Sequence, residues 1–347
     1  MFVCAVLLSC GGCNLLEYAA SGLGIETGDD ELLFMSFNVE NLFDAVDDGN
    51  EYSEYDPGKG NWGIDDYYCK LQNIARVIRS ADGGRGPDVI AFQELEKRQV
   101  LELLNGEFLP DLGYRFCFTA ERRGETVQTG VLSRVPVSGL QCHAPSENGR
   151  YIIELELSPR GKGGDARPFV LFVNHWKSKL GGVEETEYLR YAAAEFLSHR
   201  ISEISIPVIV CGDLNWDTNL TAEFSDIYAP LKQCGAPALG LPGTSSPLWI
   251  TREPVEAASV GPETVLYDPW DLSSVPGSYV WDGAWSAIDH FFVSKDFVRS
   301  GGWTVTGFSV HTAEGQCDDN GYPLRFSTRS HTGCSDHLPV LLYLEFL

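Results

Sequence analysis

The chain has 347 residues, of which 44% are hydrophobic and 12% aromatic, so it can bury a large core and does not belong to the disordered class. Its formal net charge of −24 argues against a protein that coats a polyanion with a broad basic surface. The same acidity does not exclude a polyanionic substrate at a metal site, because clustered carboxylates are ligands for Mg²⁺ or Ca²⁺ and the bound cation reverses the local field.

The first 30 residues are expected to form a signal segment and a tether. The apolar run before Cys10 is too short to span a bilayer. Leu7-Leu8-Ser9-Cys10 is similar to a bacterial lipobox, in which cleavage leaves a lipidated cysteine at the new N-terminus, although no Lys or Arg precedes it. A buried N-terminal strand is the alternative. We expect an exported lipoprotein, periplasmic or at the cell surface, with residues 31–347 as its folded domain.

The hydrophobic pattern predicts strands interleaved with a few helices. Helices are expected at 65–80, 97–104 and 184–203. Strands are expected at 32–37, 89–92, 114–118, 127–133, 151–157, 169–173, 207–211, 278–280, 287–293, 303–310 and 338–346. Residues 216–277 lack periodicity and are expected to be a long functional loop. This order predicts an α/β fold, a four-layer sandwich of two mixed β-sheets packed face to face with helices outside.

Eight cysteines follow Cys10, and an even number in an exported chain permits disulfide bonds. Cys317 and Cys334 bracket a polar insertion and are the best candidates for a pair. Cys211 lies within an apolar strand and is expected to be a core residue. No cysteine or histidine spacing is typical of a zinc site.

Polar residues with metal or phosphate chemistry recur at the ends of the predicted strands. Each has an ordinary explanation when taken alone: a solvated cap, a turn or a surface histidine. Their repetition at strand ends is more informative than any single motif. The residues are Asn38, Glu94, His175, Asp213 and Asn215 within Gly-Asp-Leu-Asn, Asp289 before His290, and Asp336 before His337.

In identity, placement and order, these residues resemble the endonuclease/exonuclease/phosphatase superfamily, over residues 32–347. That family includes pancreatic-type deoxyribonuclease, apurinic-site endonuclease, bacterial sphingomyelinase and inositol-polyphosphate phosphatases, so the resemblance implies a deoxyribonuclease-I-like fold. The opening segment 37–43, Trp62, and Gly277-Ser278-Tyr279 with Ile288-Asp289-His290 look most like a bacterial subgroup of lipoprotein type.

The resemblance also implies a metal site and phosphate-binding groups. Glu94 would be the principal Mg²⁺ ligand, with Mn²⁺ or Ca²⁺ as alternative ions. Asn38 would complete the metal and phosphate environment, and Asp336 would lie in or beside the metal shell. Asp213 would align the attacking water or assist the leaving oxygen, and Asn215 would donate a hydrogen bond to a nonbridging phosphate oxygen.

The histidines would supply the remaining chemistry. His175, with Ser178 in the family's His-x-x-Ser spacing, would contact the phosphate and stabilise its developing charge. His337 would be the general base, oriented by Asp289. His290 has no assigned role in the family and is expected to be structural.

These features predict a divalent-metal-dependent phosphoester hydrolase, a nuclease or related phosphodiesterase. The alternatives are a sphingomyelin or phospholipid phosphodiesterase, an inositol phosphatase, and a non-catalytic surface binding lipoprotein on the same fold. Four tryptophans of the long loop and its border, Trp249, Trp270, Trp281 and Trp285, would either touch a membrane or pack in the core. The expected partners are a phosphoester substrate (a nucleic acid, a phospholipid or a small phosphate ester) and a membrane reached through the lipid anchor, with the protein itself a monomer.

Overall fold

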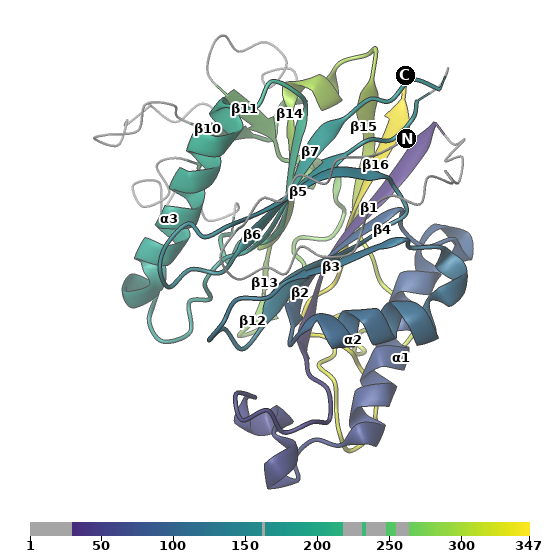
Figure 1. Cartoon of the computed structure of the whole chain (residues 1–347), viewed down its shortest axis with the longest axis vertical. Coiled ribbons are helices and arrows are strands. Elements are labelled where there is room, and N and C mark those ends of the chain that lie inside the picture. The colour runs from purple at the N-terminus through teal and green to yellow at the C-terminus, as the bar shows by residue number, and fades with distance from the viewer. Residues whose placement is uncertain (1–29, 162–163, 218–230, 234–247, 255–263) are drawn as a thin grey trace, which may run out of the picture.

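The computed structural model describes residues 30–161, 164–217, 231–233, 248–254 and 264–347 (Figure 1). The predicted signal segment with Cys10 lies outside the described residues. Within those ranges, no helix is both long and apolar enough to cross a membrane.

The first sheet has six strands, and its centre is a parallel pair. β1 (Glu31–Leu42) runs parallel to β2 (Val89–Leu95), and all other neighbours pair antiparallel. Residues of β1 alternate between two apolar environments, as the period of two in a strand requires. Phe34 packs between the sheets, whereas Leu33 and Met35 pack on the side of α1 (Ile64–Ser80). The strand order is β15 (Trp303–Val310), β16 (Val340–Phe346), β1, β2, β4 (Gln128–Ser133) and β3 (Phe116–Ala120).

The second sheet has eight strands and is also mixed. β7 (Phe169–His175) and β8 (Val208–Asp213) form its central parallel pair, and β14 (Asp289–Ser294) pairs antiparallel with β8. The strand order is β5 (Val137–His143), β6 (Ile152–Leu157), β7, β8, β14, β11 (Thr264–Tyr267), β10 (Leu248–Thr251) and β9 (Leu231–Gln233). A separate hairpin joins β12 (Tyr279–Trp281) to β13 (Ala284–Ser286).

Two expectations about strands were wrong. Residues 216–277 contain β9, β10 and β11, which extend the second sheet, so this region is not one long loop. Strands of three or four residues are too short to show a period of two. The edge strand β5 was not predicted, since its residues are only partly buried and carry no continuous apolar run.

The helices cover the outer faces of the two sheets (Figure 1). α1 and α2 (Arg98–Leu103) pack on the first sheet, and α3 (Val183–Ser202) packs on the second. Short helical turns are η1 (Ser53–Tyr55), η2 (Pro57–Lys59), η3 (Ala81–Gly84), η4 (Leu104–Phe108, a π turn), η5 (Pro110–Leu112), η7 (Pro269–Leu272) and η8 (Lys295–Val298). The four predicted layers, helix, sheet, sheet and helix, are therefore confirmed.

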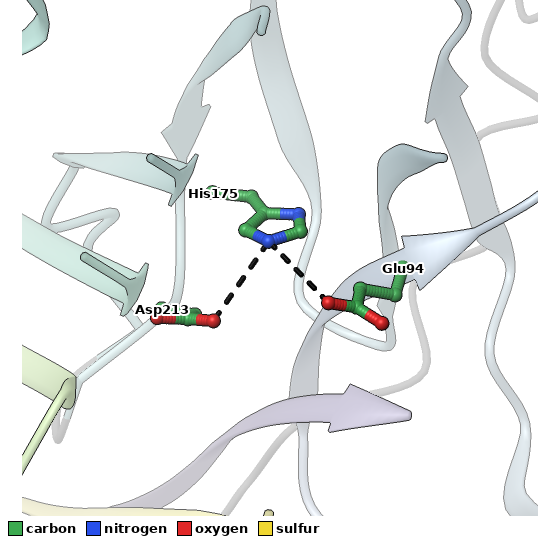
Figure 2. A group of neighbouring side chains, drawn as sticks. All are labelled: Glu94, His175 and Asp213. Carbon is green, nitrogen blue, oxygen red and sulfur yellow. Dashed lines mark ion pairs between the residues drawn. The ribbon is translucent and has the colours of Figure 1, made fainter. Parts of the chain in front are cut away.

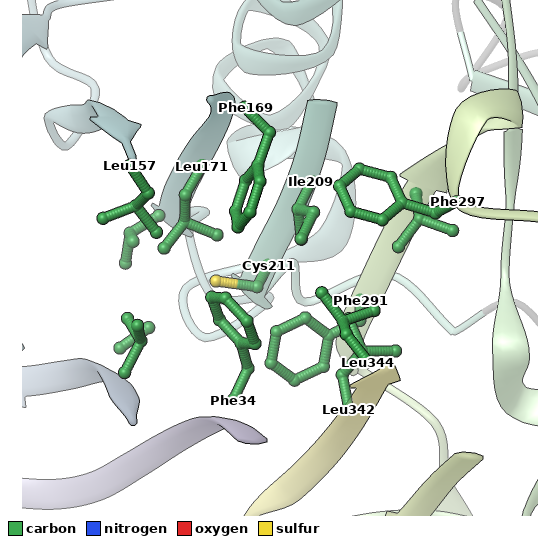
Figure 3. Packing of buried hydrophobic residues seen from close by; sticks show 14 of the residues in the cluster. Phe34, Leu157, Phe169, Leu171, Ile209, Cys211, Phe291, Phe297, Leu342 and Leu344 are labelled. Atoms are coloured by element: carbon green, nitrogen blue, oxygen red, sulfur yellow. The ribbon is translucent and has the colours of Figure 1, made fainter. Parts of the chain in front are cut away.

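A dry core fills the space between the sheets (Figure 3). Phe34, Leu342 and Leu344 of the first sheet meet side chains of β7, β8 and β14, among them Phe169 and Phe291. Each such side chain contributes roughly 1.5–3 kcal/mol when it leaves water. This core holds the two sheets together, so their strand ends keep fixed positions at the edge that carries the polar residues.

The core also decides two sequence-based expectations, of which the first was wrong. Cys317 and Cys334 are both free thiols. Two cysteines that flank an insertion in sequence need not come within the short Cα–Cα distance that a disulfide requires. Cys334 is instead buried in the hydrophobic cluster beneath α1. Trp249 and Trp270 pack inside the protein and cannot touch a membrane, whereas Trp281 is 64% exposed at the β12–β13 hairpin.

Candidate active site

The sheet topology brings the predicted strand-end residues to one edge of the sandwich. Asn38 and Glu94 lie near the carboxyl ends of the parallel strands β1 and β2. His175 and Asp213 end the parallel strands β7 and β8 and are paired in register. Because the two sheets pack face to face, both parallel pairs deliver their polar ends to the same place.

Antiparallel neighbours bring their first residues to the same edge. Asp289 opens β14 directly opposite Asp213. His337 lies just before β16, whose partner β1 runs the other way. An isolated bridge between His337 and Tyr279 fixes this segment against the β12–β13 hairpin.

The backbone at this edge is strained. In the described part of the chain, seven non-glycine residues have positive φ, and four of them are Glu40, Asn41, Glu94 and Asn215. Such conformations cost of order 1–3 kcal/mol each and persist where surrounding contacts enforce them. Gly212, at φ 131°, precedes Asp213, and a Cβ there would overlap the backbone of the neighbouring strand β7. The strain aims the polar side chains inward.

An acidic cluster of Glu94, His175 and Asp213 forms the centre of the site (Figure 2). Nε2 of His175 lies 3.7 Å from Oε1 of Glu94 and 3.8 Å from Oδ2 of Asp213. The amide Nδ2 of Asn38 donates to the same two oxygens, at 3.2 and 3.0 Å. The N–H of Asn41 donates to the other oxygen of Glu94 at 2.9 Å. The carboxylates are thus held in place by neutral donors.

His175 is neutral in this setting. Burial and the positive charges of Arg150, His337 and Lys177 lower its pKa well below 6.5. Its Nδ1 is buried without a hydrogen-bond partner in the structure. A neutral imidazole can offer one N–H to a phosphate oxygen.

The acidic cluster fits a hard divalent cation. Burial, and then the negative charge of Asp289, raise the pKa of Asp213 to about 7, so the ionised carboxylate is costly without a nearby cation. Carboxylate oxygens are the ligands that Mg²⁺ and Ca²⁺ prefer. Glu94 and Asp213 supply them, while Asn38 orders both carboxylates and turns its own Oδ1 to the N–H of Glu40. Asp336 lies beside His337, with its Oδ1 3.9 Å from Nε2 of that ring.

His337 and Asp289 form a tight buried pair. Nδ1 of His337 is 2.7 Å from Oδ2 of Asp289, which also accepts a 2.6 Å hydrogen bond from Ser278. Burial alone would lower the pKa of His337, but the carboxylates of Asp289, Asp213 and Asp336 together, Asp289 foremost, raise that pKa well above 6.5. Nε2, the other ring nitrogen, lies 4.0 Å from Oδ2 of Asp213. The imidazole therefore has a fixed tautomer and presents Nε2 to the site.

Two of the predicted phosphate-binding residues, Asn215 and Ser178, lie in different surroundings. The N–H of Asn215 donates to Asp213 at 2.8 Å, and its side-chain amide donates to the carbonyl of Trp176 at 3.1 Å. Ser178 lies on the loop after β7, where its hydroxyl accepts from the N–H of Leu180 at 3.1 Å. Asn215 thus lies at the acidic cluster, whereas the structure shows Ser178 engaged in its own loop. His290 is buried and hydrogen-bonded to the carbonyl of Trp216 at 2.9 Å.

Sequence reasoning missed the residues that support the site. Lys70 is fully buried, and its ammonium group donates to the backbone carbonyls of Glu40 and Asn41. One signal was available: Lys70 lies three residues after Tyr67 and four before Ile74, on the apolar face of α1. The hydroxyl of Ser335 donates to the carbonyl of Asn38 at 2.7 Å and accepts from the N–H of His337 at 3.0 Å. Ser335 therefore links Asn38, at the acidic cluster, to His337.

The chain was compared with known families, proteins and structures. No curated protein matches it significantly. Similar solved structures include an endonuclease/exonuclease/phosphatase family protein from Bacteroides thetaiotaomicron, at 17% identity and TM-score 0.53, covering 91% of this chain and 98% of that one. A mannosyl-6-phosphatase from the same organism has the same identity and TM-score, covering 91% of this chain and 100% of that one.

A third similar structure is sphingomyelinase C from Streptomyces griseocarneus, at 14% identity and TM-score 0.51, covering 90% of this chain and 99% of that one. Likenesses at such low identity establish the fold alone. The model of the Endonuclease/Exonuclease/phosphatase family matches residues 34–229, more than half of the chain. The chain therefore belongs to the Endonuclease/Exonuclease/phosphatase family.

Proposed function

We propose that this protein is a divalent-metal-dependent phosphoester hydrolase, a nuclease or related phosphodiesterase. The observation that carries the proposal is the meeting of the acidic cluster with the His337–Asp289 pair at one edge, with Asp213 between them. Phosphoester hydrolysis requires charge neutralisation, a base and donors to the phosphate oxygens. This edge offers candidates for all three.

In this mechanism, His337 accepts a proton from the attacking water at Nε2, while Asp289 holds Nδ1 and stabilises the imidazolium that forms. Asp213, 4.0 Å from Nε2, orients the water or assists the leaving oxygen. Neutral His175 and the amide of Asn215 donate to nonbridging phosphate oxygens. Glu94, Asp213 and, from the rim, Asp336 would hold the ion. When bound, a divalent ion neutralises phosphate charge and polarises the ester.

A phospholipid or sphingomyelin phosphodiesterase is the second candidate. The observation that favours it is the exposed ring of Trp281 on the β12–β13 hairpin, which also carries Tyr279 against His337. An aromatic side chain beside the site could rest in a lipid interface.

We also propose that the chain is exported, anchored by lipid at Cys10 and monomeric. Detergent-phase partitioning of the native protein tests the anchor, and a protein recovered in the aqueous phase contradicts it.

A substrate panel tests the proposed function. Purified protein is assayed with Mg²⁺, Mn²⁺ or Ca²⁺ against plasmid DNA, RNA, sphingomyelin vesicles, inositol phosphates and bis(p-nitrophenyl) phosphate. We expect hydrolysis that EDTA abolishes and Mg²⁺ or Mn²⁺ restores. Full activity in excess chelator would exclude a metal-dependent reaction. No hydrolysis of any of these esters with any of the three ions would favour a non-catalytic binding protein.

A further inference from the structure

A cavity of about 650 Å³ lies between two segments of the chain. One is the turn η1 with Asn61 and Trp62, and the other is 325–329, before His337. Its deeper wall is aromatic: Tyr55 and Trp62 are buried and pack edge to face at 5.1 Å. Its other wall is polar and basic and comes from residues 325–329. Neither segment contributes a residue to the acidic cluster or to the His337–Asp289 pair.

The cavity adjoins the active site through a short chain of contacts. The guanidinium of Arg325, which lines the cavity, is ion-paired with the buried carboxylate of Glu40. The N–H of Glu40 donates to Oδ1 of Asn38 at 3.0 Å, and Asn38 holds Glu94 and Asp213. Arg325 also interacts electrostatically with Asp336. The cavity therefore borders the residues that hold the acidic cluster in place.

The basic wall has the chemistry of an anion site. Arg325 is exposed over 61% of its side chain despite its pairing with Glu40. Arg329 is exposed and has neither an ion pair nor a hydrogen bond to any described residue. Ser327 and Thr328, between the two arginines in sequence, also line the cavity, and Glu54 is the one acidic residue among the described residues that line it. In a chain with a net charge of −24, two arginines at one cavity are a local exception. Guanidinium forks bind phosphate in a bidentate manner.

The aromatic wall does not offer a stacking surface. Trp62 packs against both Tyr55 and Phe326, and Phe326 is stacked on His331 at 6.1 Å. The ring of Tyr55 is also stacked on Phe43 at 5.2 Å, so these rings are engaged with one another. A ligand here is consequently recognised through its charge and not through a flat ring.

We propose that this cavity is a subsite for a second phosphate of the substrate, carried by the same molecule as the ester that is cleaved. The proposal rests on the proposed function, because the first phosphate is the one placed at the acidic cluster. Arg329 supplies an unpaired guanidinium and Arg325 the N–H groups that Glu40 leaves free. Two sources share this chemistry: the neighbouring phosphate of a nucleic acid strand, and the second phosphate of a small bisphosphate.

Calorimetric titration of the full-length protein in Mg²⁺ tests the subsite. A His337→Ala background prevents turnover during the titration. One pair of probes is the dinucleotide dTdT with and without a terminal phosphate, and the other is fructose bisphosphate and fructose monophosphate. Arg329→Gln is compared with Arg160→Gln, a matched loss of charge at an exposed residue. The neighbour of Arg160, Gly161, lies against Phe346 at the end of β16 far from His337.

We expect the added phosphate to tighten binding by about tenfold in at least one pair, the effect of a hydrogen-bonded charge. Arg329→Gln should remove most of that gain, and Arg160→Gln should leave it intact. A gain confined to the dinucleotide assigns the subsite to nucleic acid, and one confined to the sugar assigns it to small esters. Equal affinities for the two probes of each pair would overturn the subsite. So would an equal loss of the affinity gain in Arg329→Gln and Arg160→Gln.

Hydrolysis of bis(p-nitrophenyl) phosphate by the wild-type protein is measured in parallel. This substrate has a single phosphate and reports only on the acidic cluster and the base. If it is cleaved while the second phosphate brings no gain, the proposed function stands and the subsite is wrong. If no ester is cleaved but the gain depends on Arg329, the cavity binds phosphate and the proposed function is wrong.

Discussion

Charge is balanced differently in the two halves of the active site. Glu94 and Asp213 face neutral His175, so their negative charges have no partner of opposite sign within the acidic cluster. His337 and Asp289 instead compensate each other at 2.7 Å. The comparison suggests that the His337–Asp289 pair is organised by the protein alone, whereas the acidic cluster is completed by a cation. Variants that separate metal binding from proton transfer test this difference.

Loss of the principal metal ligand should have the largest effect. Glu94→Gln keeps the shape of the side chain but removes the charge, and we expect turnover to fall below detection. Saturating Mg²⁺ should stabilise the wild-type protein against urea, by about 2.7 kcal/mol at a hundredfold excess over its Kd. Glu94→Gln should lose this stabilisation, whereas His337→Ala should keep it. Equal Mg²⁺ stabilisation of wild type and Glu94→Gln would place the ion elsewhere.

Removal of the base should reduce turnover and spare the metal. We expect His337→Ala to lower kcat by roughly 10² to 10⁴, the usual contribution of general base catalysis. KM and the affinity for Mg²⁺ should change little, because His337 is not among the acidic cluster. Steady-state kinetics at saturating Mg²⁺ measure kcat and KM separately. Wild-type turnover in His337→Ala, with Glu94→Gln inactive, would make His175 the next candidate for the base.

Asp289→Asn should change the pH dependence as well as the rate. Neutral His337 is the active form, so the rate of the wild type should rise with pH through an ionisation above 6.5, since Asp289 raises the pKa of His337. Without that carboxylate, burial favours the neutral ring, and the rise should move to lower pH. Loss of orientation should cost roughly tenfold to a hundredfold in plateau rate. An unmoved profile would mean that another group controls the ionisation.

The catalytic edge could be predicted from sequence because strand ends are visible there. Asn38, Glu94, His175 and Asp213 each follow an apolar run, and parallel neighbours align such ends. The supporting contacts could not be predicted in the same way. The position of Ser335 between Asn38 and His337 depends on a segment 297 residues away in sequence from Asn38. Only the folded sheets bring the two together.

The same limit explains what the sequence left wrong or undecided. Cys317 and Cys334 were paired on spacing alone, yet both are free thiols. Trp249 and Trp270 lie among residues without clear periodicity, and only the short strands β10 and β11 and the turn η7 show that they face the core. Arg325 and Arg329 belong to no motif. Their importance comes from the cavity that they share with Tyr55 and Trp62.

The smallest effect on catalysis is expected from a second imidazole–carboxylate pair. Nε2 of His143 lies 2.7 Å from Oε2 of Glu154, as close as the pair in the active site, but it lies under α3, where Arg200 also binds Glu154. Burial would raise the pKa of Glu154, but Arg200 and His143 outweigh it and hold that pKa at about 2. The stabilisation that Glu154 contributes is therefore present at neutral pH and is lost as pH falls from the unfolded-state value toward 2.

We therefore expect His143→Ala to lower the free energy of unfolding by about 1 kcal/mol at neutral pH, because a partly buried hydrogen bond to Glu154 and the ring contact with Phe196 are lost. Turnover should be unchanged, since the side-chain contacts of His143 within the described part of the chain go to Glu154 and Phe196 and not to the acidic cluster. Urea denaturation and steady-state kinetics on the same preparation measure both quantities. His199→Ala, at an exposed position on α3, is the control and should alter neither.

If His143→Ala slowed turnover as much as Asp289→Asn does, an imidazole–carboxylate pair would affect turnover whatever its position in the fold. Unchanged turnover would show that the base owes its role to Nε2 of His337 facing Asp213 at the strand ends.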